Sequence, residues 1–124
     1  MRASDKKLNA SLRRQIVSTL AQTVADLNNI EDAKTFLNDF FTETELETFS
    51  KRLAVSYWLK KGRSYENIKQ NLKVSSATIA EISSSSDLKG IKLAMKKIEA
   101  EEWANQWADR FKKIVGRKEI STKS

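Results

Sequence analysis

The sequence of 124 residues contains no cysteine, no histidine and no proline, and it has only three glycines. The chain therefore has no disulfides, no thiolate or imidazole metal ligands, and no side chain that ordinarily titrates near neutral pH to act as a general base. Catalysis by carboxylates or lysine remains chemically possible, but no group of such residues in the sequence indicates it. We expect neither an enzyme nor a metal or cofactor site.

Long hydrophobic runs are also absent, because the longest apolar run is only a few residues. Such runs are too short for a membrane-spanning helix or the core of a signal peptide. With 40% hydrophobic residues the chain can still bury one ordinary core. We expect a cytoplasmic chain with no membrane partner, built as one helical domain over residues 1–116. The polar tail at residues 117–124 is expected to be disordered.

The net charge of +7 is concentrated at the two ends of the chain. Residues 88–124 carry ten basic and five acidic groups, and residues 1–30 carry five and two. The middle of the chain is close to balance. This distribution favours a polyanionic partner that contacts the ends, although a solvated surface that only keeps the chain soluble fits the charge equally well.

A narrow apolar stripe runs along the first predicted helix, at residues 5–28. Apolar residues recur there at spacings of three and four, and Asn28 and Asn29 are a plausible stop; the stripe is formed by Leu8, Leu12, Ile16, Leu20, Val24 and Leu27. The rest of this helix is mostly polar. A long helix with so thin a seam usually packs along a partner.

Two further helices are predicted at residues 31–41 and 42–61. Thr42 and Glu45 have the spacing of a capping box, in which each side chain hydrogen-bonds to the backbone amide of the other. Gly62 follows two lysines and fits a left-handed cap at the end of the second helix. A last helix is predicted at residues 88–115, where the tandem aromatics Trp103, Trp107 and Phe111 favour packing over base stacking.

Residues 64–84 have the pattern of a helix-turn-helix. Ser64 is a good cap for a short helix over residues 65–72, a turn follows at residues 73–75, and Ser76 can cap a second helix. The inward positions are Ile68, Leu72, Val74, Ile79 and Ile82, as expected for two short helices that cross over a tight turn. Lys73 occupies the turn position where glycine is favoured, and Lys69 stands where a small residue is usual.

Residues 36–83 resemble the tryptophan-repressor superfamily, and within it the YerC/YecD branch. The pattern that carries the resemblance is formed by Gly62, Ser64, Tyr65, Ile68, Ser75, Ala77, Thr78 and Ile79. The resemblance implies an all-α fold with a helix-turn-helix, assembled as an intertwined homodimer in which the long N-terminal helices clasp the partner.

The resemblance also implies a ligand pocket formed by Thr42, Arg52, Thr78 and Glu81. Tryptophan repressors hold their corepressor between two arginines, but the second arginine position is Glu81 here. A carboxylate cannot stack on an indole as a guanidinium does, and it would repel the carboxylate of an amino acid. Glu81 could instead pair with Arg52 and fill the pocket. We therefore predict that tryptophan is not a corepressor of this protein.

Small side chains dominate the surface that would enter a DNA groove. The predicted DNA-binding residues are Ser75, Ser76, Ala77, Thr78, Ala80, Glu81 and Ser84 on the second helix, with Lys69 and Lys73 before it. Small residues let a helix lie deep in the groove but discriminate weakly between bases, so readout is expected to depend on water and DNA shape. Glu81 costs affinity near phosphates unless it accepts a hydrogen bond from a cytosine amine.

The sequence thus favours a transcriptional regulator that binds double-stranded DNA as a homodimer, with full or weak sequence specificity. The alternative is a helical protein-interaction module that keeps the fold and has lost DNA binding. The near-neutral charge of residues 63–87 and the carboxylate of Glu81 favour this alternative.

Overall fold

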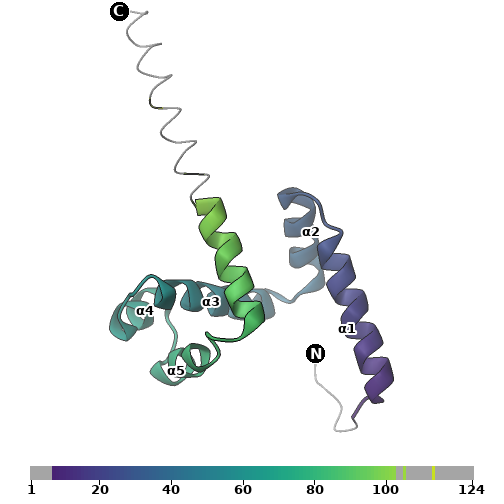
Figure 1. The fold of residues 1–124 in the computed structure, drawn as a ribbon, viewed down its shortest axis with the longest axis horizontal. Coiled ribbons are helices and arrows are strands. Elements are labelled where there is room, and N and C mark those ends of the chain that lie inside the picture. Colours follow the sequence, from purple (N-terminus) through teal and green to yellow (C-terminus); the bar gives the residue numbers. More distant parts are fainter. Residues whose placement is uncertain (1–6, 103–104, 106–112, 114–124) are drawn as a thin grey trace, which may run out of the picture. The chain divides into compact units, whose positions relative to one another are not determined.

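A computed structural model describes residues 7–102, 105 and 113 (Figure 1). These residues form helices and turns and contain no strand, which confirms the predicted all-α fold. The chain divides into two compact units, Met1–Thr48 and Phe49–Ser124. Within the described ranges, no helix combines the length and the apolar character that crossing a membrane requires. The predicted packing of Trp103, Trp107 and Phe111 and the tail at residues 117–124 lie outside the described residues.

Helix α1 of the first unit spans Ala10–Ala25 and is shorter at both ends than the predicted 5–28. It begins late because Asn9 is its N-cap: the Asn9 Oδ1 atom accepts hydrogen bonds from the amides of Ser11, at 2.8 Å, and Leu12, at 3.3 Å. At the other end the backbone amide of Asp26 caps the helix.

Helix α2 spans Ile30–Phe40, and Asn29 begins it rather than ending α1. The Asn29 Oδ1 atom accepts a hydrogen bond from the amide of Asp32 at 2.8 Å. An asparagine between two apolar stripes can end one helix or start the next. Here its side chain accepts a hydrogen bond from the following helix, so Asn29 starts that helix. Near the end of α2 the rings of Phe36 and Phe40 stack with their centroids 4.9 Å apart.

The apolar stripe of α1 remains exposed to solvent. Leu12, Ile16, Leu20 and Val24 are between 42% and 52% exposed. No residue in the range 7–48 is buried. The first unit therefore presents a continuous apolar seam that no other described residue of that unit covers.

The capping box between Thr42 and Glu45 is present as predicted. The Glu45 Oε1 atom accepts from the amide of Thr42 at 2.9 Å, and the Thr42 hydroxyl accepts from the amide of Glu45 at 3.1 Å. The hydrogen bond from the Thr42 amide lowers the pKa of the Glu45 carboxyl below its ordinary value of 4.5. Because this pKa is lowered in the folded chain, the stabilisation is full above that ordinary value and is lost as the pH falls through the lowered one.

Helix α3 spans Glu43–Lys60 and ends in the cap predicted at Gly62. Gly62 has φ of 82°, a left-handed conformation that glycine adopts without strain. The amide of Gly62 donates to the carbonyl of Leu59 at 3.0 Å, and the amide of Arg63 donates to the carbonyl of Trp58 at 3.1 Å. This pair of bonds is a Schellman motif, which turns the chain sharply into the next helix.

The core of the second unit joins α3 to two short helices, α4 (Tyr65–Leu72) and α5 (Ser76–Ser84). Val55, Ile68, Ile79 and Ile82 form its buried cluster, and the half-buried side chains of Trp58, Leu59, Leu72 and Val74 pack against it. The five positions predicted to face inward between residues 68 and 82 thus belong to this core. Burying the isoleucine side chains contributes roughly 1.5–3 kcal/mol each.

Lys73, in the turn between α4 and α5, adopts a left-handed backbone conformation with φ of 55° and ψ of 50°. Its amide donates to the carbonyl of Lys69 at 3.1 Å and so caps α4. A residue with a Cβ atom pays roughly 1–2 kcal/mol in this region, where glycine pays almost nothing. Lys73 stands where glycine is favoured, and it therefore strains the backbone locally.

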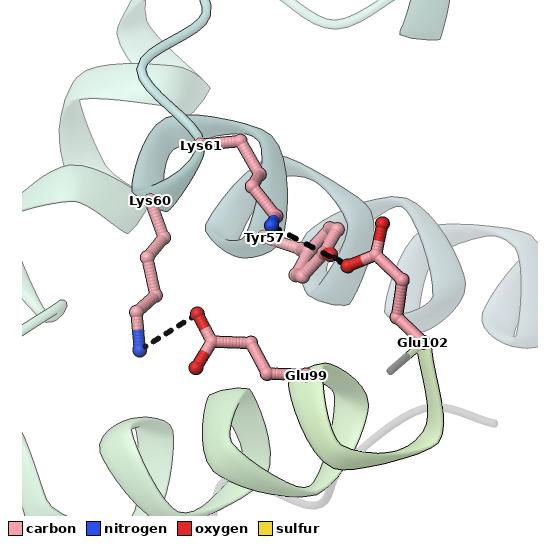
Figure 2. Close-up of polar contacts among 5 residues, drawn as sticks. All are labelled: Tyr57, Lys60, Lys61, Glu99 and Glu102. Atoms are coloured by element: carbon pink, nitrogen blue, oxygen red, sulfur yellow. Dashed lines mark hydrogen bonds and ion pairs between the residues drawn. The ribbon is translucent and has the colours of Figure 1, made fainter. Parts of the chain in front are cut away.

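A further helix spans residues 89–102; its Met95 is 4% exposed, and polar pairs join its far end to α3. Figure 2 shows that Lys60 forms an ion pair with Glu99, at 3.3 Å, and that Lys61 forms one with Glu102, at 3.4 Å. The Tyr57 hydroxyl donates to the same Glu102 carboxylate. These contacts tie the end of α3, just before α4, to residues 99–102.

Replacing Lys73 with glycine tests the strain in the turn. We expect Lys73→Gly to raise the free energy of unfolding by about 0.5–1 kcal/mol, because the relief of strain exceeds the extra entropy of the unfolded chain. The matched control is Lys69→Gly inside α4, which should lower it by about 1 kcal/mol. Urea unfolding at one protein concentration measures both. Destabilisation by Lys73→Gly would contradict the strain.

Candidate nucleic-acid interface

Helix α5 has two faces with different side chains. Ile79 and Ile82 are buried in the core. The opposite face is exposed and consists of small or polar side chains, namely Ser76, Ala77, Ala80, Glu81 and Ser84. This division follows from the three-residue spacing of the isoleucines, which places both on one side of the helix. The helix is thus fixed by one face and leaves the other free for a partner.

The N-cap of α5 is Ser75, not Ser76 as the sequence suggested. Ser75 has an extended backbone, and its Oγ atom accepts from the amide of Thr78 at 3.1 Å. The same hydroxyl donates to the Oγ1 atom of Thr78 at 2.9 Å. Two adjacent serines are equally suited to capping by type, and the backbone after Lys73 decides between them. Ser76 is the first residue of the helix.

These bonds determine which hydroxyls of α5 remain available to a partner. The Ser75 hydroxyl is engaged as both acceptor and donor by Thr78, which is itself half-buried. The Ser84 hydroxyl donates to the carbonyl of Glu81 at 2.6 Å, so it retains only acceptor capacity. Ser76 is exposed and makes no side-chain hydrogen bond within the described residues. Of the predicted hydroxyls, Ser76 is the most available to a nucleic acid.

Three cationic residues precede α5 in the chain. Lys69 of α4 and Lys73 of the turn are both exposed. Arg63, which the sequence reasoning did not select, stacks its guanidinium over the Trp58 ring with 4.1 Å between the guanidinium carbon and the ring centroid. An arginine held over an indole in this way can still donate hydrogen bonds to an anion. The sequence does contain a signal for this contact: a tryptophan stands five residues before an arginine, and a helix-capping glycine lies between them.

Of the four residues of the predicted ligand pocket, Thr42 lies in the first unit and the other three lie in the second. Arg52 and Glu81 are both exposed, and no ion pair joins them within the described residues. The pair that Glu81 could have formed with Arg52 is not present among these residues. Thr78 is bonded to Ser75, and the Thr42 hydroxyl belongs to the capping box of the first unit.

Metal binding has no support in the part of the chain that the structure describes. No group of three or more acidic side chains there is arranged to hold an ion. All hydrogen-bonding side-chain atoms that are fully buried in that part have a partner.

The family described as Trp repressor protein matches residues 15–97, from α1 to the helix at 89–102, and the chain belongs to this family. It is similar to the uncharacterized protein YerC of Bacillus subtilis (strain 168), with 28% identity over 71 residues, which cover 57% of this chain and 68% of that protein. No solved structure matches the chain significantly.

The Ser75 cap can be tested by substitution at two adjacent serines. We expect Ser75→Ala to lower the free energy of unfolding by about 1 kcal/mol, because an amide of α5 loses its acceptor, whereas Ser75→Asp should retain most of the stability. Ser76→Ala is the control and should change it by less than about 0.5 kcal/mol. Thermal unfolding followed by circular dichroism ranks the three variants. An effect of Ser76→Ala as large as that of Ser75→Ala would refute the assignment.

Proposed function

We propose that this protein is a transcriptional regulator that binds double-stranded DNA as a homodimer in the cytoplasm. In this proposal α4, the turn and α5 are a helix-turn-helix, and α5 is the helix that enters the major groove. The observation that carries the proposal is the two-faced α5 in a chain of the Trp repressor family: its isoleucines are buried, and its opposite face is exposed and small.

The chemistry of the exposed face indicates how DNA would be read. Ala77 and Ala80 permit close approach and can contact thymine methyl groups, and the Ser76 hydroxyl can donate or accept. The first amides of α5 and the side chains of Lys69 and Lys73 would hold phosphates. With so few long side chains on this face, sequence preference would be weak and would depend on bridging water and DNA shape.

The exposed seam of α1 supports the homodimer. Four apolar side chains that are almost half-exposed along one helix cost free energy in water, and pairing with a second copy would cover them. A two-fold dimer would present two α5 helices to one duplex. Successive major grooves on one side of DNA are about 34 Å apart, which is the spacing that such a dimer requires.

Glu81 is the one acidic residue among the proposed DNA-binding residues, and it opposes the binding of anions. It is exposed on the DNA-facing side of α5, and no cation neutralises it among the described residues. A carboxylate there repels both a phosphate and the carboxylate of an amino-acid corepressor. We therefore propose that DNA binding does not require L-tryptophan and is weaker than it would be without this charge.

Fluorescence anisotropy with a labelled mixed-sequence duplex tests DNA binding. With Lys69 and Lys73 of both protomers on phosphates, affinity should fall on the order of a hundredfold between about 50 and about 200 mM salt. Glu81→Gln should tighten binding by about fivefold, because two repulsive charges are removed from the dimer. The control is Asp39→Asn on α2, which removes the same charge from a helix outside the proposed DNA-binding residues and should change the affinity little.

Two measurements on the same samples separate the alternatives. Sedimentation equilibrium should give a dimer, and isothermal titration with L-tryptophan should give no binding heat. An intact dimer that does not bind DNA even at low salt would refute the regulator and leave the interaction module, which the charge of Glu81 favours. Micromolar binding of L-tryptophan would contradict the proposal for Glu81.

A further inference from the structure

Arg63, in the connection between α3 and α4, is attached to Trp58 at two points. Its backbone amide donates to the Trp58 carbonyl at 3.1 Å, as part of the Schellman motif. Its guanidinium carbon lies 4.1 Å from the centroid of the Trp58 ring. A cation over the face of an indole is attracted by the ring electrons. The side chain of Arg63 is therefore held in place although it is exposed to solvent.

Trp58 connects this arginine to the core that fixes the two short helices. It is half-buried and packs against the buried cluster that contains Ile68 of α4 and Ile79 of α5. That cluster determines which side of α5 faces outward. Arg63 is thus anchored, through one ring, to the residues that orient the exposed face of α5.

Arg63 differs from the other two cations near the end of α3 because it has no acidic partner. Lys60 forms an ion pair with Glu99 at 3.3 Å, and Lys61 forms one with Glu102 at 3.4 Å (Figure 2). Among the described residues, the guanidinium of Arg63 makes no ion pair and no hydrogen bond. Of these three cations, it is the one whose charge is left for a partner.

The acidic residue nearest to Arg63 in the sequence is engaged elsewhere. Glu66, in the first turn of α4, accepts a hydrogen bond from the side-chain amide of Gln70 at 2.9 Å. A guanidinium has five N–H donors in a planar fork, which matches two oxygens of a phosphate. A side chain that is already held in place loses little conformational entropy on binding. Arg63 therefore has the chemistry of a phosphate contact that is organised in advance.

The location of Arg63 favours the backbone of DNA as the source of that phosphate. Arg63 stands directly before Ser64, the N-cap of α4, whose hydroxyl accepts from the amide of Asn67 at 3.1 Å. In a helix-turn-helix, the second helix lies in the major groove while the first helix crosses the DNA backbone. A cation at the beginning of the first helix would therefore lie beside phosphates.

We propose that Arg63 of each protomer binds a phosphate of the DNA backbone and that Trp58 is the residue that positions it. This inference rests on the proposed function, because it requires DNA as the ligand. It adds a third phosphate contact to those of Lys69 and Lys73, whose flexible stems carry point charges. The contacts that hold Arg63 all lie within residues 58–64 of one chain, so they do not depend on how two protomers assemble.

The salt dependence of DNA binding tests the phosphate contact. The two lysines of both protomers account for a fall in affinity of about a hundredfold between about 50 and about 200 mM salt, and two further phosphates steepen the fall to about a thousandfold. Arg63→Gln should return it to about a hundredfold. Arg63→Lys should keep most of the steeper dependence but bind severalfold more weakly, because it loses the planar fork. The matched control is Lys34→Gln on α2, which should leave the dependence unchanged.

Replacing Trp58 tests whether it positions the arginine. At low salt Arg63→Gln should weaken binding by about tenfold in the unmodified chain and also in Trp58→Phe, which keeps an aromatic ring. In Trp58→Leu the same change should cost only about two- to threefold, because the two residues act together. Urea unfolding checks that each variant is folded, and the larger Trp58→Met replaces Trp58→Leu if the latter does not fold.

The outcomes distinguish this inference from the proposed function. If the unmodified chain binds DNA and Arg63→Gln leaves the salt dependence unchanged, Arg63 does not contact a phosphate and the proposed function stands. If Arg63→Gln costs as much without the ring as with it, Trp58 only supports the core and does not position Arg63. If no form of the chain binds DNA even at low salt, the proposed function and this inference fail together.

Discussion

The burial of three isoleucines against Val55 is the constraint on which the orientation of α5 and its exposed face depends. Ile68 comes from α4, and Ile79 and Ile82 come from α5, so a single small cluster fixes both short helices on α3. Helices of eight and nine residues would not be stable alone in water. The caps at Ser64 and Ser75 and the left-handed turn at Lys73 set where each helix begins and ends. The cluster then sets which side of α5 faces outward.

Much of this arrangement could be predicted from the sequence, because it depends on local rules. The spacing of apolar residues predicted all five core positions between residues 68 and 82, and the capping box and Gly62 were recognisable by residue type and position. Two of the three errors in helix boundaries occurred where neighbouring residues had the same chemistry. Asn9 starts α1 later than its stripe suggested, Asn29 begins a helix instead of ending one, and Ser75 caps in place of Ser76. Side-chain type limits the position of a cap, and only the backbone selects it.

Contacts between distant segments could not be predicted in this way. Periodicity does not show that Leu59 and Met95, more than thirty residues apart, line the same hollow. The ion pairs of Lys60 and Lys61 with Glu99 and Glu102 bridge about forty residues of sequence. The expected pairing of Arg52 with Glu81 fails for the same reason: opposite charges in a sequence identify possible partners, while the helix packing determines which atoms approach each other.

The separation of the two faces of α5 has an evolutionary consequence. Ala77, Ala80, Glu81 and Ser84 are exposed and take no part in the buried cluster, so they can be exchanged with little loss of stability. Ile79 and Ile82 cannot change without disturbing the positions of both short helices. A descendant of this chain could therefore acquire a different binding preference through a few surface substitutions while inheriting the same scaffold. Divergence of recognition and preservation of fold would then proceed along one helix without interfering with each other.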